Sequence, residues 1–309
     1  MKKCLFGVMC VVLTVGSLAV AGSFDATLVP NDARWIVHID FAALRDSTIG
    51  KYVLSQDMNA EMKEHWQKAE EMLGMSLRED VNAVTLFGTG AGQDDGVMWI
   101  RGKLNSETLV SQLSEMDGYE SSQQGAYTIH SWVDAAEDSS QRYYGVVLDE
   151  TRGLLGPNED LVKNALKVLA GEVANVKDGG IPVGSLQASG MLIAATADLR
   201  DVELPANPML GQAKPSIHNF RMQMRENDGT LGLRLAVQQG SEQEAEQAEQ
   251  MLNGIKMMGV MQLQQQNPEF AALLQAMNLR RNGAVLMLDM DYPAEKVATL
   301  LQQAAASAE

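Results

Sequence analysis

The stretch LGLRLAVQQGSEQEAEQAEQML, residues 231–252, joins one strand to one helix and decides the fold class. Its first half alternates apolar side chains with small or polar ones, which is the period of a half-buried strand. The apolar positions are Leu231, Leu233, Leu235 and Val237. Ser241 then stands where a helix N-cap is expected, and good helix formers follow it. This pattern predicts a strand, a short polar joint and an α-helix.

The same order of strand, polar joint and helix recurs at residues 97–116, 153–171 and 284–304. Ser106 and Asn158 are the predicted N-caps of two of these helices, and Pro293 suits the first turn of the third. The glycine at the joint in 153–171 also invites comparison with a phosphate-binding loop. That segment has no Gly-Lys-Ser/Thr triplet and carries two acids, so we interpret it as a capped turn.

The remaining elements follow from the same periodicities. We expect further strands at 35–41, 81–88, 126–133, 142–149, 190–199 and 217–226, and helices at 58–73, 242–263 and 268–277. Segments 81–88 and 97–102 are predicted to pair as a hairpin around the glycine-rich loop 88–96.

The order of these elements predicts an α+β protein made of two similar halves. Each half is expected to be a mainly antiparallel sheet with helices packed on one face. The breaker-rich segment DGGIPVG, 178–184, separates an N-terminal half, 22–178, from a C-terminal half, 185–309. The shared order of elements suggests a diverged internal duplication.

The N-terminus has the features of an export signal. Lys2 and Lys3 precede an apolar run, and Ala19-Val20-Ala21 fits the rule for signal peptidase, so residues 1–21 are the predicted signal peptide. The apolar run is shorter than a membrane span, which disfavours an uncleaved anchor. We expect a periplasmic or secreted protein that begins at Gly22 and has no membrane attachment after cleavage.

Charge and cysteine content exclude several classes of function. Both cysteines, Cys4 and Cys10, lie in the predicted signal, so the mature chain would have neither a disulfide nor a thiolate centre. Without Lys2 and Lys3, 22 basic residues face 40 acidic ones, and the net charge is 22 − 40 = −18. Such a chain repels nucleic acid phosphates.

No residue is assigned a catalytic, cofactor-binding or metal-binding role. The loop 88–96 leads into a strand rather than a helix, unlike a dinucleotide loop. The four histidines, none at ligand spacing, are interpreted as packing or surface residues: His38, His65, His130 and His218. Carboxylate pairs such as Asp198 with Asp201, or Asp149 with Glu150, are not placed in space by the sequence.

Methionine is the one enriched residue with chemical interest, because thioethers bind Cu(I). The groups are Met257, Met258 and Met261; Met222 and Met224; and Met287 and Met290. All lie on apolar stripes of predicted helices or strands, so we interpret them as core residues that fill gaps between helix and sheet.

The segment VPNDARWIVHIDFAALRDSTIG, residues 29–50, resembles the start of uncharacterised exported bacterial proteins. The resemblance rests on Pro30, Asp32 and Ala33 before the strand, and on the Ala-Leu-Arg-x-Ser phrase at 43–47. It implies no activity and no functional residues.

The sequence therefore favours an exported, soluble, non-catalytic binding protein with an unknown partner in the envelope. A carboxylate-based hydrolase and a methionine-based metal carrier are the alternatives. A broad exposed apolar patch would favour the binding protein, and outward-facing methionines would favour the carrier. A pocket with two carboxylates of perturbed pKa would favour the hydrolase.

Overall fold

The computed structural model describes residues 22–306 apart from 56–69, 71–74, 77, 91–94, 135–140, 189 and 201–215. The predicted signal peptide and most of the predicted helix at 58–73 lie outside the described residues.

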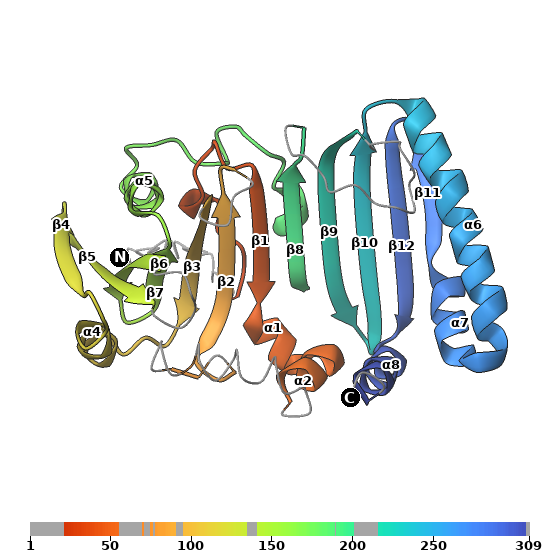
Figure 1. Ribbon diagram of the computed structural model, residues 1–309, viewed down its shortest axis with the longest axis horizontal. Helices are drawn as coiled ribbons and strands as arrows, with labels where there is room; N and C mark the ends of the chain where they lie inside the picture. The colour runs from red at the N-terminus through yellow and green to blue at the C-terminus, as the bar shows by residue number, and fades with distance from the viewer. Residues whose placement is uncertain are drawn as a thin grey trace, which may run out of the picture.

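The described strands form a single twelve-stranded antiparallel sheet that runs across the whole molecule (Figure 1). Its strand order is β11-β12-β10-β9-β8-β1-β2-β3-β7-β6-β5-β4. The strands are β1 (Trp35–Asp40), β2 (Val81–Gly88), β3 (Gly96–Gly102), β4 (Glu120–Gln124), β5 (Tyr127–Asp134), β6 (Gln141–Asp149), β7 (Arg152–Gly156), β8 (Met191–Asp198), β9 (Ile217–Asn227), β10 (Thr230–Gln239), β11 (Asn278–Asn282) and β12 (Val285–Pro293).

Seven α-helices and two short 3₁₀-helices, η1 (Ala26–Leu28) and η3 (Gly184–Leu186), accompany the sheet in the described ranges. The α-helices are α1 (Phe41–Asp46), α2 (Thr48–Leu54), α4 (Ser106–Ser114), α5 (Glu159–Leu169), α6 (Glu242–Gln266), α7 (Pro268–Ala276) and α8 (Ala294–Ala306). Asn158 and Ser241 cap α5 and α6 as predicted. The cap of α4 is Asn105 rather than Ser106, because the Asn105 side chain accepts from the Thr108 N–H at 3.0 Å.

The α+β class and the antiparallel pairing are confirmed, but the strands do not divide into one sheet per half. β1 pairs with β2 on one side and with β8 on the other, so the first strand of each half lies beside the other. This pairing satisfies the backbone groups that two separate sheets would leave exposed at their edges.

In the N-terminal half, helices pack on both faces of the sheet, so the prediction that they cover one face is wrong for that half. In the C-terminal half, α7 and α8 pack on one face, as predicted. The α5 face is the one on which Ile36, Phe87 and Val97 lie side by side in register. These side chains pack with α5, whereas the next residues along β3, Met98 and Ile100, belong to a cluster with Leu109 of α4 on the other face. We call this second face the α7 face.

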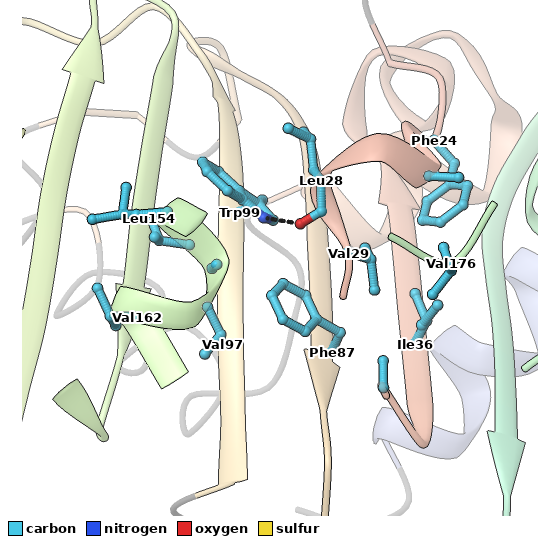
Figure 2. Close-up of a cluster of buried hydrophobic side chains, with 14 of the residues drawn as sticks. Phe24, Leu28, Val29, Ile36, Phe87, Val97, Trp99, Leu154, Val162 and Val176 are labelled. Atoms are coloured by element: carbon cyan, nitrogen blue, oxygen red, sulfur yellow. Dashed lines mark hydrogen bonds between the residues drawn. The ribbon is translucent and has the colours of Figure 1, made fainter. Parts of the chain in front are cut away.

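The largest apolar core lies on the α5 face of the N-terminal half (Figure 2). There Trp99, which is 1% exposed, donates its indole N–H to the Leu28 carbonyl at 2.8 Å. A second core lies on the α7 face of the C-terminal half, and it includes Leu44 and Ile49 of α1 and α2 together with Met290 and Leu300. Residues from the first sixth of the chain therefore complete the core beneath its last helices.

Candidate binding surface

Helices α6 and α7 lie at one end of the sheet (Figure 1). They carry an exposed apolar surface. Of the seven large apolar side chains that are exposed in the described structure, six lie on these two helices. They are Leu252, Ile255, Met257, Met258 and Met261 of α6 and Phe270 of α7. Met257, Met258 and Met261 are 66%, 65% and 70% exposed. We call the three methionines the α6 patch.

The helical period explains why the methionines face outward. At about 100° per residue, Met257, Met258 and Met261 fall within about 100° of arc. Ala245, which is fully buried, and Gly259, which faces Leu274 of α7, lie on the opposite side of the helix. The sheet and α7 therefore occupy the side of α6 that the methionines do not use.

Charged groups near the α6 patch are turned inward. The Lys256 ammonium donates to the Gln275 and Met277 carbonyls at the end of α7. Glu249 pairs with Arg281 of β11 at 3.3 Å. From Met257 to Gln266 the helix has no charged residue, so the patch is neutral on a strongly acidic chain.

The interpretation of the methionines as core residues is only partly confirmed. Met290 is buried, and Met224 packs against the same core on the α7 face. For Met257, Met258 and Met261 the interpretation is wrong. The sequence showed that these methionines share one side of the helix. It did not show that α7 packs against the opposite side of α6 and leaves the methionines exposed.

His38 and His130 are buried packing residues, as predicted, and His218 is half-buried beside Ser216, while His65 lies outside the described residues. His38 is 2% exposed and lies between the Thr85 hydroxyl, at 2.9 Å, and the Gly22 carbonyl, at 2.8 Å. Burial lowers the pKa of His38, and the contact with the Gly22 carbonyl only partly offsets this. Burial also lowers the pKa of His130.

These shifts predict that the protein loses stability as pH falls from about 7 towards 5. The unfolded chain takes up a proton at His38 near its ordinary pKa, about 6.5, whereas the folded chain does so only at lower pH. Stability is therefore greatest above the unfolded pKa and falls progressively below it. Urea titrations across this range should give a shallower pH slope for His38→Gln than for the wild type. An unchanged slope in His38→Gln would show that another titrating group controls the pH dependence of stability.

One carboxylate of each suggested pair, Asp149 and Asp198, is held by an arginine. Burial tends to raise the pKa of Asp149, but hydrogen bonds from Thr151 and Arg152 bring it to about 2. Asp198 also has a pKa of about 2, chiefly because Arg200 donates to it. Five strand spacings, about 24 Å, separate the strands of these two carboxylates. Asp201 lies outside the described residues, so the pair of Asp198 with Asp201 stays untested.

An open polar depression of about 680 Å³ lies beside the start of α4, lined by Asp80, Lys103, Glu107 and Glu150 among others. If the protein were a carboxylate-based hydrolase, the acidic residues of this depression would be its candidate catalytic groups in the described structure. In the same residues, no three His, Cys, Asp or Glu side chains gather as they would around a metal ion. No described helix combines the length and apolarity needed to cross a bilayer.

Strands β2 and β3, on either side of the glycine-rich segment, pair antiparallel as predicted, with Gly88 opposite Gly96. The start of α5 is likewise a capped turn. Asn158 accepts from the N–H groups of Asp160 and Leu161, at 2.9 and 3.3 Å, which are donors that a phosphate would need.

Comparison with solved structures shows a similar fold in TP0453, a bacterial protein from Treponema. Crystal form III of TP0453 superposes with a TM-score of 0.52 at 13% sequence identity, over 91% of this chain and 99% of that one. Crystal forms IV and I give TM-scores of 0.47 and 0.45. Neither a known family nor a curated protein matches the sequence. The fold resembles that of TP0453, and at this identity the likeness concerns the fold alone.

Proposed function

We propose that the protein is an exported, non-catalytic binding protein that recognises an apolar surface of an envelope protein through the α6 patch. The observation that carries this proposal is the outward exposure of Met257, Met258 and Met261 on a neutral stretch of α6. Exposed apolar patches of this kind mark interaction sites more often than isolated apolar side chains do.

The spacing along α6 suggests how the partner is contacted. Gly254, Met257, Met258 and Met261 stand at positions i, i+3, i+4 and i+7. This is the anchor pattern of a helix that lies in an apolar groove of another protein. The open space above Gly254 leaves room for a close approach. Methionine suits such a role because its flexible thioether adapts to irregular surfaces.

Site-specific photocrosslinking in native envelopes tests this proposal. Gln262 is exposed next to the α6 patch, whereas Gln243 is exposed about 28 Å away at the start of the same helix. A photoreactive residue at 262 should give a discrete adduct, and one at 243 should not. Replacing Met257, Met258 and Met261 together by Gln should abolish the adduct at 262, because it removes the apolar anchors.

The matched control replaces the same three methionines by Leu, which keeps volume and apolarity but removes sulfur. The adduct should survive in this variant. Equal adducts at 243 and 262, or an adduct that persists in the Gln variant, would contradict the proposed surface. Because the experiment uses envelopes and N-terminal sequencing of the adduct, it also checks export and the predicted start at Gly22.

The second candidate is a methionine-based Cu(I) carrier, which the outward-facing thioethers favour. The two candidates respond differently to the Leu variant. A carrier would lose stoichiometric Cu(I) binding when sulfur is removed, whereas partner binding would persist.

We also infer that the two halves derive from one duplicated unit. From the centre outward, the strands follow β1-β2-β3-β7-β6 in one half and β8-β9-β10-β12-β11 in the other. Helix α4 follows β3 and α6 follows β10, whereas α5, after β7, and α8, after β12, pack on opposite faces of the sheet. Superposition about a two-fold axis between β1 and β8 should align these strands in order, and strands out of register would reject the inference.

A further inference from the structure

Arginines gather on the part of the α5 face that belongs to the C-terminal half. In register, Ile36 continues into Thr196, Arg221, Ala236 and Met287, so the face that is apolar in one half is polar in the other. On β9 to β12 this face bears four arginines and two aspartates: Arg221, Arg225, Arg234, Arg280, Asp289 and Asp291. This is a local excess of positive charge on a chain whose net charge is −16.

A pit of about 250 Å³ opens between these strands. Ala236 forms its floor, with Arg221 directly opposite on β9 and Met287 directly opposite on β12. Arg234 lies two residues along β10 on the same face, and Val285 adds to the apolar side. The pit thus has arginines on one side and an apolar wall on the other, with a small side chain between them, and Gln223 and Asp289 also line it.

The polar groups around the pit have unused donors. The Arg221 side chain makes no hydrogen bond or ion pair within the described residues, and it is exposed. Arg234 and Arg280 share the single carboxylate of Asp289, which leaves one of their charges uncompensated. The buried Ser185 hydroxyl lines the pit and has no hydrogen-bond partner in the same part of the chain.

We propose that this pit binds a small organic carboxylate with an apolar body. The carboxylate would lie between Arg221 and Arg234, which can both donate to it, and the hydrocarbon part would pack against Met287 and Val285. Charge-assisted hydrogen bonds from guanidinium groups are the strong, geometrically specific contacts for carboxylates. The pit is smaller than the cavities that hold drug-sized ligands, which limits the ligand to a short chain or a single ring. This site lies on the face of the sheet opposite α7 and does not rest on the α6 patch.

Calorimetric titration of the full-length exported protein with four probes tests the proposal: hexanoate, hexanamide, acetate and inorganic phosphate. Hexanoate should bind, and hexanamide, which has the same chain without charge, should bind at least about tenfold more weakly. Acetate should also be weaker, because it lacks the methylenes that contact the apolar wall. If hexanamide bound as tightly as hexanoate, the proposed contact between carboxylate and guanidinium would be wrong. If acetate or phosphate bound as tightly as hexanoate, the proposed contact with the apolar wall would be wrong.

Two matched substitutions on β9 locate the binding. Arg221→Gln removes the unpaired guanidinium at the pit, whereas Arg225→Gln removes the same charge four residues along β9 on the same face, beside Asp291. Arg221→Gln should weaken hexanoate binding about tenfold or more, and Arg225→Gln less than about twofold. If both substitutions weakened hexanoate binding equally, the ligand would be attracted by the general positive charge of this face rather than bound in the pit, and the proposal would be overturned. The four probes on the wild type decide the matter even if a variant fails to fold.

Discussion

Replacing Trp99 by Ala should lower the free energy of unfolding by about 3–5 kcal/mol. Trp99 is 1% exposed at the centre of the largest core, between Leu28, Val97 and Leu154 (Figure 2). Its removal leaves a cavity that the surrounding strands can fill only in part. The loss is a large fraction of the 5–15 kcal/mol that stabilises an ordinary domain. Urea unfolding monitored by circular dichroism gives the value, and a loss under about 1 kcal/mol would contradict the packing seen here.

A second tryptophan provides a control that separates packing from hydrogen bonding. Trp132 is also 1% exposed, but its indole nitrogen has no partner in the described residues. Both Trp→Phe substitutions remove similar volume, yet only Trp99→Phe leaves a buried carbonyl, that of Leu28, without its donor. Trp99→Phe should therefore cost about 1–3 kcal/mol more than Trp132→Phe. Equal costs would mean that the Trp99–Leu28 hydrogen bond contributes nothing measurable.

Two helical glycines should respond to alanine in opposite directions. A Cβ on Gly50 of α2 would lie 1.8 Å from the Leu44 carbonyl oxygen, which is backbone and cannot move aside. Gly50→Ala should therefore destabilise the protein by about 1–3 kcal/mol, as overpacking does. It would also displace α2, whose Ile49 helps to close the core beneath α8.

Gly254 of α6 is the matched control, because nothing lies within 4 Å of the position its Cβ would take. Gly254→Ala should stabilise the protein by about 0.5–1 kcal/mol through helix propensity and a less flexible unfolded chain. Thermal or urea unfolding of the two variants shows whether each substitution raises or lowers the free energy of unfolding. If Gly50→Ala also stabilised the protein, the close approach of α1 and α2 would be wrong.

Local chemistry was enough to predict most of the elements. The alternation in 231–239 predicted β10, and Ser241 predicted the start of α6, because both signals depend only on near neighbours in the chain. The strands β4 and β11 were missed. Their sequences, ESSQQ and NLRRN, are polar and mostly exposed at the two edges of the sheet, so no apolar period marks them.

Tertiary contacts decided the rest. The pairing of β1 with β8 joins residues about 160 positions apart, and no local pattern in either strand specifies that partner. The methionines of α6 and the arginines around Ala236 were equally ambiguous, since a stripe on a helix or strand shows only which side chains share a face. Whether that face is covered depends on where other elements pack. Sequence alone thus determined the α+β class and most strand–helix joints of this protein, while the single sheet, the α6 patch and the arginine pit arose from contacts between distant segments.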